Sequence, residues 1–149
     1  MFEHHLNMNA DITLASVDVS INEAKRFGII DCNDDTSLKS FEEKPDNPKS
    51  IHASMGIYLF KTNVLEYLLK DVEHRENVDF GKNVIPRAHA EGFRLFAYPF
   101  KGYWRDVGTI ESLFQANMDM LDDPQYLDLN LSKGIQIYSK SMNLPPHIV

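Results

Sequence analysis

The sequence predicts an α/β domain with a mixed sheet, on three observations. Apolar runs that alternate or continue predict strands, amphipathic runs between them predict helices, and a turn cluster at Asn33–Thr36 predicts a β-hairpin. With 149 residues and 43% hydrophobic residues, the chain has the length and composition of one globular domain with a buried core. We expect one domain over residues 1–149, without internal repeats or a linker.

Residues 1–9 are interpreted as the end of a helix. Residues 20–27 are expected to form a loop or short helix, and 44–50, with two prolines, a loop. Strands are expected over 11–19, 28–32, 38–42, 53–60, 93–100 and 135–138. Further helices are expected after Thr62 or Asn63, from Asp79 to Ala90, and over Ile110–Leu121 with Thr109 as cap.

Three details of these elements can be checked against a structure. Pro86 is expected to kink or shorten the helix that begins at Asp79, because proline lacks the backbone N–H that a helix interior uses. The nearly continuous apolar run over 53–60 predicts a strand buried on both faces. Gly92 is expected to follow the end of a helix.

Composition and charge exclude several classes of protein. A net charge of −7 argues against a nucleic-acid-binding protein, and no apolar run approaches the roughly 18 residues that span a bilayer. The start of the chain does not resemble a signal peptide. Cys32, the only cysteine, leaves no internal disulfide and no cysteine-based zinc site, which fits a cytoplasmic setting. The six histidines have no metal-site spacing and are interpreted as surface or packing residues.

The first candidate site is Phe41–Pro45, which ends in two carboxylates, a lysine and a proline. Lys44 is a candidate to bind a phosphate group as a fixed ammonium, and Glu43 to accept hydrogen bonds from sugar hydroxyls. The alternative is a solvated charge cluster at the end of a strand. Residue types alone leave both interpretations open.

The second candidate site is Tyr103–Thr109, which precedes the last expected helix. Asp106 is a candidate Mg²⁺ ligand, or else a carboxylate paired with Arg105 or with the first amides of the helix. Gly108 favours function slightly, because glycine allows close approach of a ligand. Both candidate stretches follow strands, and we expect them to face each other across one sugar-phosphate site.

Ser54 is a third candidate, because a hydroxyl within an apolar strand needs a hydrogen-bond partner. That partner is either a sugar hydroxyl or a neighbouring carbonyl. The sequence has no G-x-G-x-x-G or Walker phosphate loop and no recognisable nucleophile–base pair. The residues alone therefore indicate an α/β domain with a candidate site for a phosphorylated small molecule.

A family resemblance extends this interpretation over almost the whole chain. It is carried by runs in the following order: Glu23–Gly28, Phe41–Pro45, Ala53–Tyr58, Asp79–Lys82, Tyr103–Thr109 and Leu144–Pro146. In this order they resemble the bacterial glucose-1-phosphate adenylyltransferases (ADP-glucose pyrophosphorylases). Residues 75–78 depart from the family pattern, which affects the expected local loop geometry. The resemblance implies a Rossmann-like, glycosyltransferase-A-like nucleotidyltransferase domain that is incomplete at its N-terminus.

The resemblance also implies a reaction and residue roles. The family makes ADP-glucose and pyrophosphate from ATP and glucose 1-phosphate with Mg²⁺, in the cytoplasm, for glycogen synthesis, as homo- or heterotetramers. By match to its motifs, Lys44 would bind the sugar phosphate and Asp106 one metal ion, both as catalytic residues. Glu43 and Ser54 would hydrogen-bond the glucose.

The resemblance further implies an internal fragment: the sugar-phosphate-binding half of a catalytic domain, with residues 135–149 leading toward a C-terminal β-helix. We expect such a fragment to be inactive alone. The alternatives are a non-catalytic regulatory subunit of the same fold and an independent sugar-phosphate-binding module.

Overall fold

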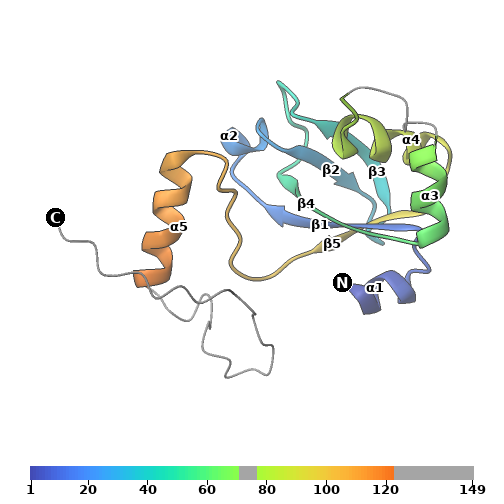
Figure 1. Ribbon diagram of the computed structural model, residues 1–149, viewed down its shortest axis with the longest axis horizontal. Helices are drawn as coiled ribbons and strands as arrows, with labels where there is room; N and C mark the ends of the chain where they lie inside the picture. The colour runs from blue at the N-terminus through green and yellow to red at the C-terminus, as the bar shows by residue number, and fades with distance from the viewer. Residues whose placement is uncertain (71–76, 123–149) are drawn as a thin grey trace. The chain divides into compact units, whose positions relative to one another are not determined.

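The computed structural model describes residues 1–70 and 77–122. It divides the chain into two compact units, Met1–Lys101 and Gly102–Val149, which are described here one at a time (Figure 1). The strand expected over 135–138 lies outside the described residues. Within the described ranges, no helix has the length and apolar character needed to cross a membrane.

The first unit is built on a five-stranded mixed sheet, as the sequence predicts. Its strands are β1 (Ile12–Asp18), β2 (Gly28–Cys32), β3 (Leu38–Glu43), β4 (His52–Phe60) and β5 (Leu95–Pro99), in the spatial order β3-β2-β4-β1-β5. β1 pairs with β4 antiparallel and with β5 parallel, and β2 and β3 form the expected antiparallel hairpin. The sheet with its helices is seen in Figure 1.

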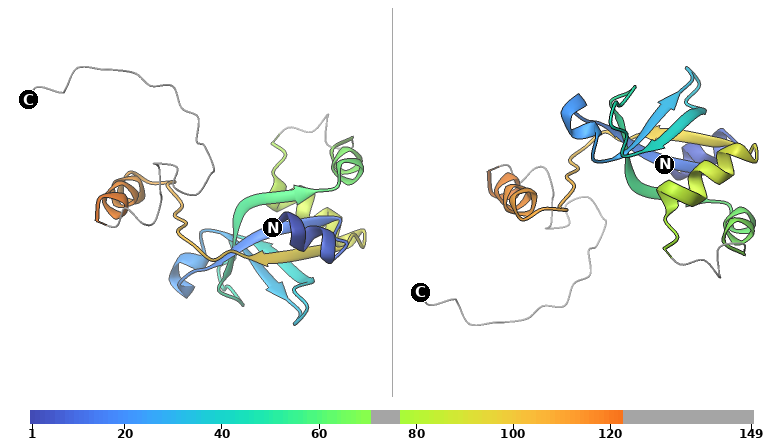
Figure 2. Two further views of the ribbon diagram at one scale, coloured as in Figure 1. Left: turned by 90° about the horizontal axis from the view of Figure 1, so that it is seen from below. Right: turned by 90° about the horizontal axis from the view of Figure 1, so that it is seen from above.

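The main core lies on the face of the sheet formed by Ile12, Leu14 and Ile30. Helices α3 (Thr62–Lys70) and α4 (Ile85–Ala90) pack their apolar residues against it, among them Leu68. The short helix α1 (Phe2–Asn7) lies on the opposite face from α4, as the two views of Figure 2 show. There the ring Nδ1 of buried His5 lies 2.8 Å from Thr13 Oγ1. Both faces of β1 are therefore covered.

Local signals account for several boundaries. Ser20 forms a capping box with Glu23 at the short helix α2 (Ile21–Ala24). Gly92 follows α4 with a φ of +79°, as expected of a residue just after a helix. In the second unit, Thr109 Oγ1 accepts the Ser112 N–H at 3.1 Å and so caps α5 (Ile110–Asp122).

The expected effect of Pro86 is confirmed in a specific form. The segment after Asp79 is a five-residue π-helix, η1 (Phe80–Val84), followed by α4 with Pro86 in its first turn. Proline is tolerated there because the first N–H groups of a helix have no intrahelical acceptor. Asp79 caps η1 by accepting the Lys82 N–H at 2.8 Å.

The prediction that β4 is buried on both faces is wrong. Ile57 is 49% exposed, and within β4 only Ala53 and Ser54 are buried. β2 pairs with β4 at Ala53 alone, so the described part of the chain places no further strand beside the rest of that edge. A bulge around Gly56, with a φ of +70°, further turns the strand out of the regular sheet.

One half-buried carboxylate connects the ends of three strands. Asp11, just before β1, accepts hydrogen bonds from Lys61 Nζ at 2.8 Å and from the Arg94 N–H at 2.9 Å. Lys61 follows β4 and Arg94 precedes β5. Burial alone would raise the pKa of Asp11, but the bonds from Lys61 and Arg94 outweigh it and hold the pKa well below its usual range.

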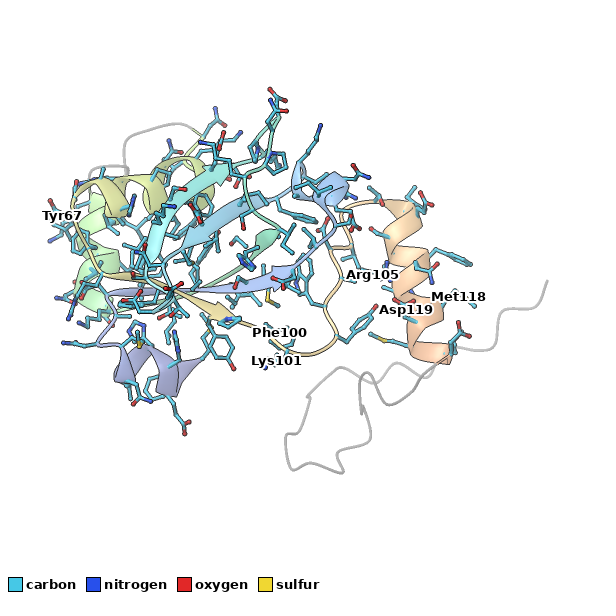
Figure 3. The ribbon with its side chains drawn as sticks, turned by 180° about the vertical axis from the view of Figure 1, so that it is seen from behind. Tyr67, Phe100, Lys101, Arg105, Met118 and Asp119 are labelled. Atoms are coloured by element: carbon cyan, nitrogen blue, oxygen red, sulfur yellow. The ribbon has the colours of Figure 1, made fainter. Side chains whose placement is uncertain are left out.

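The second unit is described by α5 and the segment before it. Arg105 Nη2 lies 2.7 Å from Asp119 Oδ2, and the Tyr103 hydroxyl donates to the same oxygen at 2.9 Å. Figure 3 labels Arg105 and Asp119 at this contact. The segment that carries Asp106 is thus attached to the helix that follows it.

Candidate functional site

Glu43 is the last residue of β3 and lies opposite Gly28 in the ladder. Its side chain is 19% exposed, yet no residue in the described ranges donates a hydrogen bond to it. The nearest cation is Lys44 Nζ, 3.9 Å from Glu43 Oε1. The carboxylate oxygens of Glu43 are not among the fully buried, unsatisfied polar atoms, so they remain accessible from outside. A partly buried carboxylate that is accessible and has no protein donor can accept hydrogen bonds from the hydroxyls of a ligand.

Lys44 leaves the strand in a strained conformation. Its φ is +52°, which is uncommon for a residue with a side chain, and its N–H donates to the Phe27 carbonyl at 3.0 Å. The side chain is 61% exposed, so the ammonium remains accessible beside Glu43. Backbone strain that neighbouring strands hold in place is typical of functional sites.

Ser54 is buried, and within the protein its hydroxyl bonds to groups other than the expected carbonyl, whereas the sugar hydroxyl stays a prediction. Its hydroxyl accepts the Gly56 N–H at 3.3 Å and donates to the Tyr58 hydroxyl at 3.5 Å. Residues four apart in a regular strand lie about 13 Å from each other. The bulge around Gly56 therefore contributes to bringing the two hydroxyls together.

Tyr58 adds a residue that the sequence analysis did not single out. Burial raises the pKa of Tyr58, the hydrogen bond from Ser54 lowers it, and the charges of Glu43 and Asp79 raise it further. Its ring stacks on Phe80, with ring centroids 5.8 Å apart. Hydroxyls, carboxylates and a flat aromatic wall thus gather at one place, a set suited to a polyhydroxylated ring.

Asp79 was predicted only as a helix cap, and the structure also brings its carboxylate near Glu43. Both carboxylates lie close to Gly81 in η1, as the distances given below show. The sequence carried no signal that brings Asp79 to Glu43, because this approach depends on how η1 packs against β3.

Asp106 belongs to the second unit, where it is half-buried. A Cβ atom at Gly108 would lie 3.1 Å from Asp106 Oδ2, so this glycine leaves room for the aspartate carboxylate. Arg105 forms an ion pair with Asp119. That Asp106 faces Glu43 and Lys44 across one site stays a prediction, because the two units are described separately.

The residues present fit a Mg²⁺ site only in part. Asp106 offers one carboxylate, and no three His, Cys, Asp or Glu side chains gather as metal ligands in the described part of the chain. Mg²⁺ is usually held by one or two carboxylates together with substrate phosphates. Asp106 therefore fits such a site as one of its ligands. Substrate phosphates and other groups would supply the remaining ligands.

A separate cavity of about 310 Å³ lies in the first unit, away from Glu43. Its lining consists of Ser16, Cys32, Asn33, Asp34, Thr36, His52, Ala97 and Pro99. Burial, followed by the charge of Asp31, raises the pKa of the Cys32 thiol to about 11.

We expect native Cys32 to react with iodoacetamide at pH 8 about tenfold more slowly than the same thiol in urea. The raised pKa reduces the thiolate fraction about 100-fold, and the greater nucleophilicity of a more basic thiolate recovers about tenfold. Mass spectrometry of timed samples measures both rates. Equal rates would contradict burial of this thiol.

The family model described as "Nucleotidyl transferase" matches residues 1–123 of the 149. The chain belongs to the nucleotidyl transferase family.

Three relatives of this nucleotidyl transferase chain bear the name glucose-1-phosphate adenylyltransferase. That of Clostridium novyi is 51% identical over 98% of the chain, that of Bacillus licheniformis 53% over 100%, and that of Clostridioides difficile 45% over 100%. The resemblance inferred from the motifs is thereby confirmed, as is the α/β nucleotidyltransferase fold. The chain spans about two fifths of the length of these relatives.

Proposed function

We propose that this chain carries the glucose 1-phosphate site of a glucose-1-phosphate adenylyltransferase. The complete enzyme transfers the adenylyl group of ATP to glucose 1-phosphate and releases ADP-glucose and pyrophosphate. The proposal includes a cytoplasmic role in glycogen synthesis, assembly as a tetramer, and a role for residues 135–149 as the connection to a β-helix domain. It includes inactivity of this chain by itself.

The observation that carries the proposal is the Glu43 carboxylate. It is partly buried, lacks a donor in the described ranges, and lies beside an accessible ammonium. Its charge also acts on Tyr58, whose hydroxyl is linked to that of Ser54. A sugar phosphate matches this set, because its hydroxyls donate to the carboxylate and its phosphate pairs with the ammonium. The names of the relatives support glucose 1-phosphate as that sugar phosphate.

Each residue has a proposed task in the reaction. Lys44 neutralises charge on the phosphate of glucose 1-phosphate and so lets a phosphate oxygen approach the α-phosphate of ATP. Glu43 and Ser54 orient the sugar through its hydroxyls. Asp106 would hold Mg²⁺, which when bound supplies positive charge to the phosphate oxygens. Positioning and charge neutralisation are the main requirements of such a transfer, so no covalent nucleophile is needed.

Two measurements test the proposal. Titration of the ¹⁵N-labelled chain with glucose 1-phosphate is expected to shift the amide signals of Glu43, Lys44 and Ser54, and ATP is not expected to shift them. A chimera, in which this chain replaces the matching segment of the Clostridium novyi relative, is expected to form ADP-glucose, whereas the chain alone is not.

The outcomes separate the alternatives. A chimera that binds glucose 1-phosphate but does not form ADP-glucose would support a non-catalytic subunit. A chain whose signals do not respond to glucose 1-phosphate would overturn the assignment of the sugar site. The same chimera with Asp106→Asn is the control. It is expected to form much less ADP-glucose, because the proposed transfer depends on this carboxylate.

A further inference from the structure

The Glu43 carboxylate occupies space that two glycines leave open. A Cβ atom at Gly81 would lie 2.5 Å from Glu43 Oε2 and 3.3 Å from Asp79 Oδ1. A Cβ atom at Gly28 would lie 2.8 Å from the same Glu43 oxygen. Real Cβ atoms essentially never lie within 3.0 Å of another atom, so the two distances to Glu43 Oε2 exclude a side chain at either position while Glu43 stays where it is. The two glycines come from separate elements, β2 and η1.

Backbone conformation does not explain the glycine at position 81. Among the glycines in residues 1–70 and 77–122, those with positive φ are 56, 92 and 102, and Gly81 is not one of them. Its conformation is therefore open to alanine. Gly81 is buried in the first turn of η1, and replacing glycine by alanine at a backbone conformation that alanine accepts stabilises a chain by about 0.4–1 kcal/mol, because it lowers the entropy of the unfolded state. The remaining reason for glycine is the space that the Glu43 carboxylate uses. Gly28 is less informative, because a Cβ there would also lie 2.5 Å from Phe41 Cζ.

We propose that Gly81 is a positioning residue for sugar binding: the absence of a side chain at this position allows η1 to hold Glu43 in the orientation that accepts a sugar hydroxyl. This inference rests on the proposed function, because it takes Glu43 as a sugar ligand. It assigns η1 a role in the affinity for the sugar phosphate, although Gly81 has no side chain that contacts this ligand.

The consequence of Gly81→Ala follows from what would have to move. The clashing atom is the end of a flexible side chain, so the methyl group displaces the Glu43 carboxylate instead of the backbone. The displaced carboxylate has access to solvent, so its movement costs the fold little, and alanine lowers the entropy of the unfolded chain. We therefore expect an unchanged or higher unfolding temperature together with an about tenfold weaker affinity for glucose 1-phosphate.

A double-mutant cycle tests this in the whole chain. Calorimetric titration with glucose 1-phosphate gives the affinity of the unchanged chain, Gly81→Ala, Glu43→Ala and the double variant. If Gly81 acts through Glu43, the double variant binds as weakly as Glu43→Ala alone. Ala90→Gly, an exposed change at the end of α4, is the matched control, with a lower unfolding temperature and unchanged affinity.

The outcomes test the positioning role of Gly81 separately from the proposed sugar-binding role of Glu43. If Glu43→Ala weakens binding but Gly81→Ala does not, or if the two effects add, the positioning role is overturned and the sugar site stands. If Gly81→Ala unfolds the chain, Gly81 is a structural residue and the inference fails. If Glu43→Ala leaves the affinity unchanged, the sugar-binding role of Glu43 fails, and the positioning role fails with it.

Discussion

Replacing Lys44 by alanine is expected to weaken binding of glucose 1-phosphate roughly 50-fold, about 2.3 kcal/mol. The expected loss is that of one charge-assisted contact between an ammonium and a phosphate. Lys44 is suited to this contact because its N–H is fixed on the Phe27 carbonyl while its side chain stays 61% exposed beside Glu43. Calorimetric titration of the chain with glucose 1-phosphate measures the change.

Two further variants separate the ammonium from the backbone. Lys49→Ala removes an exposed lysine from the same loop and is expected to leave the affinity unchanged. Lys44→Gly is expected to bind as weakly as Lys44→Ala but to unfold at a higher temperature, because glycine relieves the positive φ of this position. Lys44→Ala with an unchanged affinity would exclude the phosphate role.

Replacing Asp11 by asparagine is expected to lower the free energy of unfolding by about 2 kcal/mol at pH 7. The side chain is 16% exposed and accepts bonds from Lys61 and Arg94, so the change removes charge from a contact that connects three strands. Urea denaturation measures the difference. Asp31→Asn, which removes an exposed pair with Lys39, is the control and is expected to cost less than 1 kcal/mol.

The pH dependence gives the same prediction an independent check. The pKa of Asp11 is lowered in the folded chain, so the unfolded chain binds the proton at a higher pH than the folded chain does. The stability from Asp11 is therefore complete above the unfolded pKa of about 3.9 and is lost as pH falls below it toward the folded pKa. The difference between the unchanged chain and Asp11→Asn should be full at pH 7 and smaller at pH 3. A difference that does not change with pH would contradict the ionic origin of this contribution.

Local patterns were sufficient to predict much of the fold. The alternation over 11–19 gave β1, the turn cluster before Leu38 gave the β2–β3 hairpin, and Thr109 gave the start of α5. Each of these features depends on residues that are neighbours in sequence. The π-helix over Phe80–Val84 was not predicted, since Pro86 indicated that a helix would be disturbed without indicating how.

Errors arose where burial depends on partners far away in sequence. The apolar run in β4 predicted two covered faces, but apolar residues show what a strand could bury and not which strands lie beside it. The chemistry of Glu43 and Lys44 was visible in the sequence. Their neighbours Tyr58 and Asp79 were not, because the bulge at Gly56 and the approach of η1 to β3 bring them there.

The place of Gly81 in a helix bears on how this protein responds to selection. Stability and ligand affinity favour different residues at position 81, alanine for the first and glycine for the second. A library selected only for resistance to proteolysis should accumulate alanine there, and one selected for binding of glucose 1-phosphate should retain glycine. Lys44, strained at a φ of +52°, should show the same opposition between the two selections. Positions where the two selections disagree would then outline the sugar site without any bound ligand.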